Sequence, residues 1–295
     1  MLEMLTTEKR NGNTMELDIL STGELLHVMS DEDQKVSLAV REQIPQIRKA
    51  VEYIVEALKT GGRLIYLGAG TSGRIGLLDA VECPPTFGTN PEVVKGIMAG
   101  GDKAFIKAVE GAEDNKELAV EDLQGISLNS GDVLVGLAAS GRTPYVIAGL
   151  EYAKRINVTC ISISCNENSL IGKVADVCIE LNVGPEVLTG STRLKAGTAQ
   201  KMVCNMLTTA PMVGLGKVYQ NLMVDLNPSN EKLMHRARKI IMDATSCDYR
   251  TAGEYLVLAN NNPKIAIVMI LTGDDYDSSV DRLERADGFV RKALG

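Results

Sequence analysis

The feature that most constrains this chain is residues 63–85, RLIYLGAGTSGRIGLLDAVECPP, in which an apolar run leads into a glycine-rich loop and then a helical pattern. The apolar run, Leu64 to Leu67, predicts a buried strand. Glycines relieve the loop of side chains and hydroxyls add donors, at Gly68, Gly70, Thr71, Ser72 and Gly73. Backbone N–H groups can therefore approach an anion at the positive end of the following helix.

A second loop repeats the first in register, again after an apolar run, residues 133–137. The repeated residues are Gly68, Ser72, Gly73 and Arg74 in the first loop and Gly136, Ser140, Gly141 and Arg142 in the second. The first loop also matches G-x-G-x-x-G, which is typical of dinucleotide sites. Two equivalent loops with hydroxyls instead favour one small phosphorylated ligand held from two sides. No GK[ST] follows either loop, which excludes a P-loop.

Two charges oppose the dipole of the helix that we expect after the first loop. Arg74 falls in its first turn, and Glu82 falls in its last turn before Cys83-Pro84-Pro85. If exposed, each costs at most about 0.3–1 kcal/mol, so solvation explains either one alone. Together they favour a functional role, because residues that break local rules collect at functional sites.

Composition narrows the class of protein. The 295 residues are 45% hydrophobic and 23% charged, which is typical of one large globular domain with a small appendage. The net charge of −7 argues against a nucleic-acid partner. Because the overall field is negative, an anionic substrate must be bound by local cations. The candidate cations are Arg74, Arg142, Arg193 and Lys195.

Location and metal binding are also constrained. The first residues lack an apolar signal core, and the longest apolar run, residues 265–271, is far shorter than the ~20 residues of a membrane span. We therefore expect a cytoplasmic protein without membrane contact. The six cysteines form no CxxC pair and the two histidines have no zinc spacing, so the thiols are interpreted as buried or inert and no metal is expected.

The order of patterns along the chain predicts the fold. Residues 15–59 have helical periodicity, with Ser30 as a candidate N-cap before Asp31, Glu32 and Asp33. Strands are predicted at residues 64–67, 93–98, 133–137, 158–163 and 177–181, with helical patterns at 103–110, 144–155 and 170–175. This alternation predicts an α/β fold with a doubly wound parallel five-stranded sheet. Such sheets bind ligands beyond the carboxyl ends of their strands.

A third loop, residues 184–201, leads into a long apolar helix that extends to about Val213. It concentrates donors and cations at Thr189, Ser191, Thr192, Arg193 and Lys195, although an exposed polar loop is the plain alternative. Beyond Gly216 helical patterns occur at 230–242, 249–260 and 278–294. Residues 265–271 fit a sixth strand or, slightly better, a buried helix.

Four segments together resemble the bacterial N-acetylmuramic acid 6-phosphate etherase family: GAGTSGR…LDAVECPPTF, AVEGAED, AASGRTPYVIAGLEYA and GPEVLTGSTRLKAGTAQK. The resemblance spans nearly the whole chain and implies a SIS (sugar isomerase) domain of flavodoxin-like topology in residues 61–215. Residues 1–60 would pack on this core and on the interface of a homodimer, and residues 216–295 would be an all-helical region of the ubiquitin-associated type. The third motif is shared with the glucokinase regulatory protein. Val81 and Gly12 depart from the family pattern, without removing a chemical group.

The resemblance implies cleavage of the ether between C3 of the sugar and D-lactate, without metal or cofactor. Its catalytic pair would be Glu82 and Glu113. A helix end and the neighbouring prolines would discourage ionisation of Glu82, which favours it as the acid and Glu113 as the base. Without the resemblance, a solvated acidic turn is the plainer interpretation of Glu113. The implied substrate-binding residues are Gly70, Thr71, Ser72, Arg74, Ser140, Arg142, Thr143, Ser191 and Lys195, with the two serines on the 6-phosphate.

Two other functions fit parts of the pattern. A protein that senses a sugar phosphate would use the same phosphate loops without turnover, but it would not need the carboxyl pair. An aldose–ketose isomerase would also use a glutamate base at C2, but it would leave the lactyl ether intact. Release of D-lactate separates both from an etherase.

Overall fold

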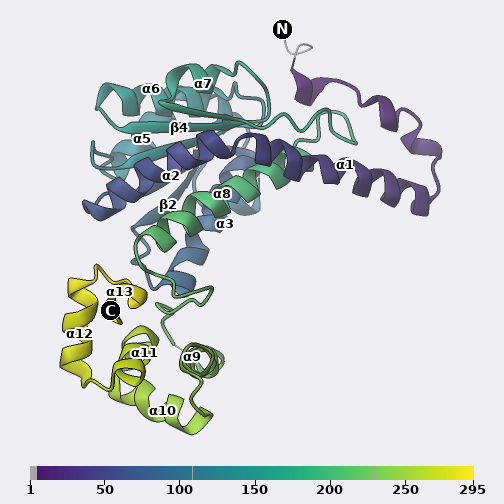
Figure 1. The fold of residues 1–295 in the computed structure, drawn as a ribbon. Coiled ribbons are helices and arrows are strands. Elements are labelled where there is room, and N and C mark those ends of the chain that lie inside the picture. The colour runs from purple at the N-terminus through teal and green to yellow at the C-terminus, as the bar shows by residue number, and fades with distance from the viewer. Residues whose placement is uncertain (1–4, 108, 229) are drawn as a thin grey trace. The chain divides into compact units, whose positions relative to one another are not determined.

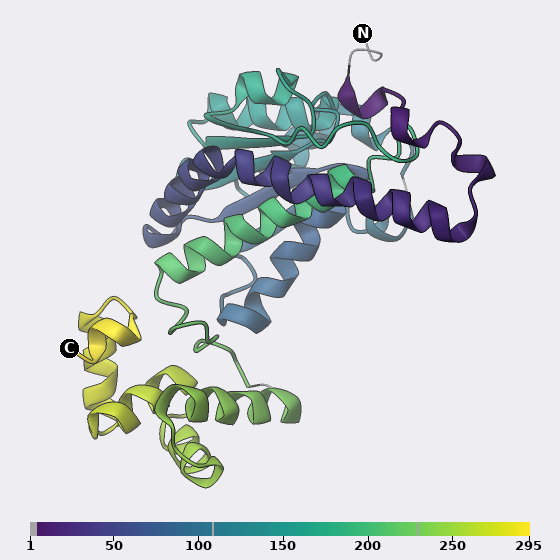
Figure 2. The same cartoon turned by 45° about the vertical axis from the view of Figure 1, so that its right-hand side comes forward.

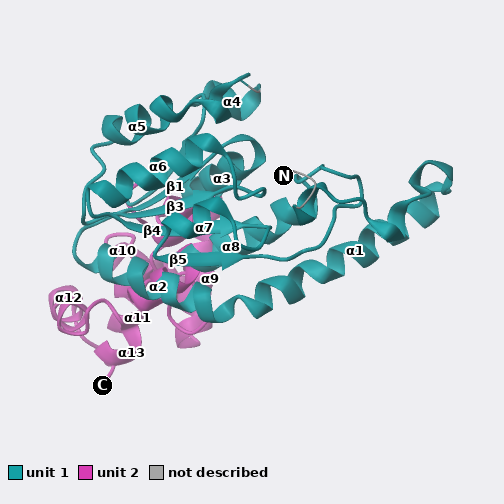
Figure 3. Ribbon diagram, turned by 90° about the horizontal axis from the view of Figure 1, so that it is seen from above, with its two compact units in different colours: residues 1–81, 92–207 teal, residues 82–91, 208–295 magenta. Residues whose placement is uncertain are grey.

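The computed structural model describes residues 5–107, 109–228 and 230–295 (Figure 1). The chain forms two compact units, drawn in two colours in Figure 3. The first unit comprises Met1–Val81 and Glu92–Leu207, and the second comprises Glu82–Pro91 and Thr208–Gly295. Each unit contains a hydrophobic core of its own.

The first unit is built on one parallel sheet in the order β2-β1-β3-β4-β5. The strands are β1 (Leu64–Gly68), β2 (Val94–Met98), β3 (Val133–Leu137), β4 (Thr159–Ser164) and β5 (Val177–Glu180). Each lies within one residue of its predicted position, so the predicted five-stranded doubly wound sheet is confirmed. From β1 the chain adds β2 on one side and then β3, β4 and β5 on the other, so the strand order switches between β1 and β3. Parallel sheets of this kind bind ligands at such a switch point.

Helices cover both faces of this sheet. The helices that begin in the first unit are α1 (Thr22–Glu42), α2 (Ile44–Lys59), α3 (Gly70–Phe87), α4 (Lys103–Ile106), α5 (Lys116–Gly125), α6 (Pro144–Arg155), α7 (Leu170–Val174) and α8 (Lys195–Gly214). Helices α5, α6 and α7 pack together on one face, and α2, α3 and α8 lie on the other (Figures 1 and 2). Short 3-10 helices are η2 (Thr6–Glu8), η3 (Gly12–Thr14), η4 (Leu17–Ile19) and η5 (Ala112–Asp114).

The boundaries of several helices differ from the prediction. Helix α1 begins at Thr22, where Ser21 and Glu24 form a capping box, so the expectation that Ser30 caps this helix is wrong. The pattern predicted as one helix over 103–110 ends at Ile106, and the unpredicted helix α5 follows. The side chain of Asn115 caps α5 by accepting a hydrogen bond from the Leu118 amide.

The second unit is helical. Its helices are α9 (Glu231–Thr245), α10 (Tyr249–Leu258), α11 (Pro263–Thr272), α12 (Tyr276–Arg285) and α13 (Val290–Ala293). Residues 265–271 lie in α11, so the buried-helix interpretation of this run is correct. The helix predicted over 278–294 is two helices, because Asp287 and Gly288 both have positive φ. Over the described ranges, no helix combines the length and apolarity that crossing a membrane requires.

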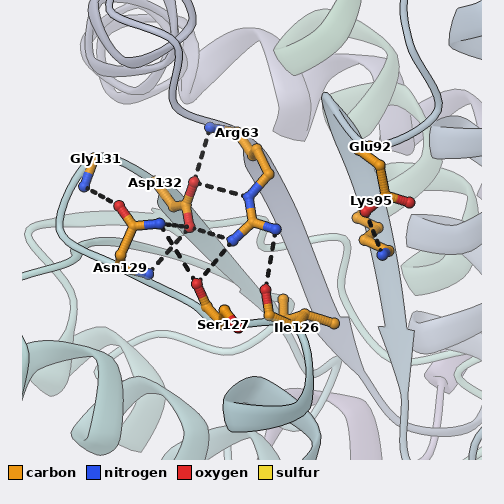
Figure 4. Close-up of polar contacts among 8 residues, drawn as sticks. All are labelled: Arg63, Glu92, Lys95, Ile126, Ser127, Asn129, Gly131 and Asp132. Atoms are coloured by element: carbon orange, nitrogen blue, oxygen red, sulfur yellow. Dashed lines mark hydrogen bonds and ion pairs between the residues drawn. The ribbon is translucent and has the colours of Figure 1, made fainter.

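A polar cluster fastens the amino ends of β1 and β3 (Figure 4). The Asp132 carboxylate accepts hydrogen bonds from the Arg63 amide at 3.0 Å and from the Arg63 guanidinium at 2.7 and 3.0 Å. The guanidinium also donates to the carbonyls of Ile126 and Ser127. Hydrogen bonding to Asp132 raises the pKa of Arg63. This cluster lies at the end of the sheet opposite to the two glycine loops, and it fixes the register of neighbouring strands.

Candidate active site

The first glycine loop follows β1 and opens α3. A Cβ atom on Gly68 would lie 2.7 Å from the Gly73 nitrogen, and one on Gly73 would lie 2.8 Å from the Gly68 carbonyl oxygen. These two glycines therefore let the loop fold closely on itself. Gly70 differs, because its φ is +54° and a Cβ there would meet no atom within 4 Å. Of the three glycines expected to clear space for an anion, Gly70 is the one with open backbone.

Ser72 lies in the first turn of α3 and its side chain is largely buried. Its Oγ donates a hydrogen bond to Oε1 of Gln200 on α8, at 2.8 Å. The sequence interpretation singled out the serine but not its partner, because no local pattern marks a glutamine 128 positions away. Thr71 beside it is half-buried.

The second loop follows β3 and opens α6, so the repeated motifs stand on neighbouring paired strands. Oγ of Ser140 accepts the amide of Arg142 at 3.2 Å. Gly141 has a φ of +70°, and a Cβ there would lie only 2.4 Å from Cβ of Ser169. Thr143 is the N-cap of α6, and Ser140, Arg142 and Thr143 are all half-buried. The predicted placing of the two loops at the carboxyl ends of strands is thus observed.

A pocket of about 340 Å³ joins the first loop to the acidic turn. Its lining residues are Ala69, Gly70, Arg74, Met98, Ala99, Ala104, Val109, Glu110, Gly111, Ala112 and Glu113. Glu113 is exposed and lies on η5, after Gly111 has turned the chain with a φ of +73°. The structure therefore brings the predicted base, Glu113, into one cavity with Gly70 and Arg74 of the phosphate loop.

Arg74 forms part of the wall of this pocket. Its Nε donates to the carbonyl of Phe105 at 2.8 Å, and its Nη2 donates to the carbonyl of Ala104 at 2.7 Å. These carbonyls belong to α4, so the guanidinium satisfies acceptors at the end of one helix although it projects from the start of another. The unfavourable position predicted for this charge in α3 is compensated by α4.

Glu82 is an exposed residue of α3 and belongs to the second compact unit. The helix continues to Phe87 with Pro84 and Pro85 inside it, so the prediction that Glu82 lies in the last turn is wrong. The reason is local: the Gly88 amide donates to the Pro84 carbonyl at 2.9 Å, which carries the helical bonding past the prolines. The argument from the helix end for Glu82 as the acid therefore loses its premise.

Lys195, predicted to contact substrate, is fully buried at the start of α8. Its Nζ donates to Oε2 of Glu32 at 2.6 Å, and its amide donates to Glu186 at 3.0 Å. Burial raises the pKa of Glu32, but hydrogen bonds from Lys195, Lys35 and Asn13 outweigh burial and lower this pKa to about 2. Lys195 thus completes a buried ion pair, and its contact with substrate stays a prediction.

The remaining candidates lie around the third loop or concern metal binding. Ser191 is half-buried, and Arg193 is exposed.

The described residues contain no group of three or more His, Cys, Asp or Glu side chains placed to hold a metal ion. All six cysteines lie within the described residues and none forms a disulfide. Burial raises the pKa of Cys160 to about 12 and of Cys178 to about 11. Such thiols are poor nucleophiles at neutral pH.

Comparison with known proteins identifies the domain that carries this site. Residues 46–154 match the N-terminal SIS domain of glucokinase regulatory protein, and residues 115–210 match the SIS domain. A solved protein of E. coli CFT073 has a TM-score of 0.50 and 17% identity, over 68% of this chain and 97% of that chain. A Bacteroides fragilis NCTC 9343 protein involved in capsule formation has a TM-score of 0.51 and 22% identity, over 67% and 94%. These structures share the fold.

Curated relatives match over the whole length. The N-acetylmuramic acid 6-phosphate etherase of Geobacillus sp. (strain WCH70) is 58% identical over 294 residues, covering 100% of both chains. The enzymes of that name from Bacillus cytotoxicus and Exiguobacterium sp. are 57% and 56% identical with the same coverage. The resemblance inferred from the four motifs is confirmed, and the chain belongs to the N-acetylmuramic acid 6-phosphate etherase family.

Proposed function

We propose that this chain cleaves the D-lactyl ether of N-acetylmuramic acid 6-phosphate, with water, to N-acetylglucosamine 6-phosphate and D-lactate, in the recycling of cell-wall sugars. The observation that carries the proposal is 58% identity to an etherase over the entire chain. The pocket that joins Glu113 to the first glycine loop supports it, because the reaction needs a carboxylate beside a phosphate site.

The chemistry requires an acid and a base, because an alkoxide is a poor leaving group. Ring opening exposes the C1 aldehyde, which acidifies the C2 proton. Glu113, which lines the pocket beside the first glycine loop, removes this proton. Glu82, the other carboxyl that the family resemblance implies, then protonates the ether oxygen as the C3–O bond breaks and lactate departs. Water then adds to C3 of the unsaturated aldehyde, and a proton returns to C2. The exposed position of both carboxyls supports proton exchange with solvent.

The phosphate of the substrate is held by the two repeated loops in this proposal. Ser72 and Ser140 donate to its oxygens, with Thr71 and Thr143 beside them. Both loops start helices, and the first N–H groups of a helix lack partners within it, which favours an anion. Gly70 offers the open backbone for this approach. Contacts from Arg142, Ser191 and Lys195 rest on the family resemblance alone.

The proposal also includes a homodimer in the cytoplasm. In the first unit, α1 projects from the body of the sheet domain (Figures 1 and 3), and Leu26 and Leu38 on it are each 60% exposed. Large apolar side chains exposed along one helix favour contact with a partner. The absence of a disulfide among the six described cysteines is compatible with a reducing compartment.

The decisive experiment is to incubate the purified protein with N-acetylmuramic acid 6-phosphate in D₂O and to assay D-lactate and deuterium at C2. Wild type should release lactate and place deuterium at C2 of the product. Glu82→Gln should exchange the C2 proton but release about 10²–10⁴-fold less lactate, whereas Glu113→Gln should do neither. In ¹⁸O-labelled water, the label should enter at C3.

Each alternative has its own signature in this experiment. Binding without lactate release would indicate a sensor, and conversion of hexose phosphates with the ether intact would indicate an isomerase. If Glu113→Gln exchanges the proton and Glu82→Gln does not, the two roles must be swapped. Glu117→Gln makes the same change at an exposed position of α5 and should keep full activity.

A further inference from the structure

Gln200 holds the hydroxyl proton of Ser72 while one end of its own amide lacks a partner. Its side chain is only 1% exposed, and Oε1 accepts from Ser72 Oγ at 2.8 Å. Its Nε2 is buried and has no hydrogen-bond partner among the described residues. A buried N–H group without an acceptor is destabilising, and native structures rarely keep one without a reason.

The face of α8 that carries Gln200 is packed on the first glycine loop. A Cβ atom on Gly197 would lie 3.5 Å from Cγ2 of Thr71 and 3.6 Å from Cδ1 of Ile75. Gly197 and Gln200 are three residues apart, so they share one face of the helix. A Cβ at position 197 would make ordinary van der Waals contacts with Thr71 and Ile75. This face of α8 therefore packs against the start of α3, where Gln200 reaches Ser72.

This arrangement conflicts with phosphate binding unless the amide moves. A serine hydroxyl has one proton, and a phosphate dianion has only acceptors to offer. While Ser72 donates to Gln200, its proton is not available for the phosphate. Ser140 in the second loop differs, because its Oγ accepts the Arg142 amide and so does not use its proton in that bond. The two loops repeat in sequence but not in the direction of their hydrogen bonds.

We infer that Gln200 is a positioning residue for the sugar phosphate, acting through Ser72. When the phosphate binds, the carboxamide of Gln200 turns over, Nε2–H donates to Ser72 Oγ, and the Ser72 hydroxyl donates to a phosphate oxygen. The two ends of a carboxamide have nearly the same shape, so the turn leaves the packing of α8 unchanged. It gives the buried N–H an acceptor and adds a charge-assisted hydrogen bond to the ligand. This inference rests on the proposed function.

A double-mutant cycle tests the inference, with N-acetylglucosamine 6-phosphate as the probe in calorimetric titrations. Gln200→Leu removes the donor that orients Ser72 and should weaken binding about three- to tenfold. In a Ser72→Ala background the same change should weaken binding by less than about twofold, because the residue through which Gln200 acts is gone. If Gln200→Leu weakens binding by the same factor in wild type and in Ser72→Ala, or does not weaken it at all, the inference is overturned.

A second variant guards against a folding defect in Gln200→Leu. Gln200→Glu keeps the shape but, when ionised, only accepts, so it holds the Ser72 proton permanently. It should weaken binding at least as much as Ser72→Ala, and binding as tight as wild type would contradict the inference. Gln124→Leu, the same change at an exposed position of α5, should bind as wild type does.

The proposed function fails separately. Wild type that releases no D-lactate and binds no sugar phosphate overturns both ideas. Wild type that does both, with an additive cycle, overturns only the role of Gln200.

Discussion

The two ends of strands β1 and β3 carry similar polar groups but organise them in opposite ways. At the amino end, the Asp132 carboxylate and the Arg63 guanidinium bond each other, and the guanidinium also bonds two backbone carbonyls. At the carboxyl end, Ser72 donates to Gln200, whose Nε2 has no partner among the described residues. The first, closed network pairs its charged groups with one another, whereas the second, open one leaves a buried donor unused. The comparison teaches that the carboxyl end of the sheet keeps a polar group whose bonding a ligand can complete, and the amino end does not.

Lys195 shows that charge and position in a motif do not decide to which kind of network a residue belongs. It stands in the third loop motif beside Ser191, as a ligand-binding cation would. Yet it is fully buried and bonded to Glu32, which also accepts hydrogen bonds from Lys35 and Asn13. By its contacts, Lys195 belongs with the closed networks.

The largest effect we expect is on stability, from Glu32→Gln. The change removes the carboxylate to which the buried Lys195 ammonium is bonded, and breaking one side of a buried ion pair costs about 3–5 kcal/mol. Urea unfolding of the two proteins at pH 7 measures the difference in free energy of unfolding. If Glu32→Gln instead weakens sugar-phosphate binding and leaves stability unchanged, Lys195 acts with the ligand loops and the comparison fails.

The pH dependence sharpens the same prediction. The folded-state pKa of Glu32 is about 2, below its ordinary value of 4.5, so its contribution to stability is present above pH 4.5. It is lost as the pH falls from there towards 2, and wild type should lose about 3 kcal/mol over that range that Glu32→Gln does not lose. Glu42→Gln, at an exposed position of α1, is the matched control and should differ from wild type by less than about 0.5 kcal/mol.

A smaller loss of stability is expected from Asp132→Asn. The amide keeps the shape of the carboxylate but turns one acceptor into a donor facing the Arg63 guanidinium, which removes charge-assisted bonds worth about 2–3 kcal/mol. Unfolding should need less urea, while kcat/KM for lactate release at 25 °C stays within about twofold of wild type.

Measuring the activity of Asp132→Asn tests the comparison between the two ends of the sheet. A large fall in kcat/KM for folded Asp132→Asn would mean that the amino end of the sheet is coupled to the site. Asp33→Asn makes the same change at an exposed position of α1 and should leave both stability and activity unaltered.

The sequence foretold the sheet better than the networks. Buried strands appear as short apolar runs, so all five strands were predicted within one residue. The predicted start of α1 was wrong, because Ser21 and Ser30 both precede acidic residues and either could cap a helix. The acidic residue Glu32 is instead bound to Lys195, 163 positions away, and no local pattern shows that pairing. Partners such as Gln200 leave no local pattern, since contacts between distant residues are fixed by packing.

Glu113 and Glu82 illustrate the same limit within the candidate site. Glu113 was singled out by the family motif. The fold brings it into one pocket with Arg74, and the spacing of these residues along the chain does not predict that they meet. For Glu82, two prolines suggested the end of a helix that in fact continues to Phe87. Proline removes one donor, but it does not prevent later amides from continuing the helix.

The smallest effect concerns the open end of the sheet, where Ser72→Ala and Ser140→Ala should each weaken binding of N-acetylglucosamine 6-phosphate by about tenfold or more. A hydrogen bond to a charged group contributes about 1.5–3 kcal/mol, and 1.4 kcal/mol is a factor of ten in affinity. Ser130→Ala is the matched control, because Ser130 is exposed just before β3, near the closed Arg63–Asp132 cluster. Its affinity should equal that of wild type. Unchanged affinity in both loop variants would refute the two-loop phosphate site, whereas a loss in only one would show which of the two repeated loops carries the phosphate.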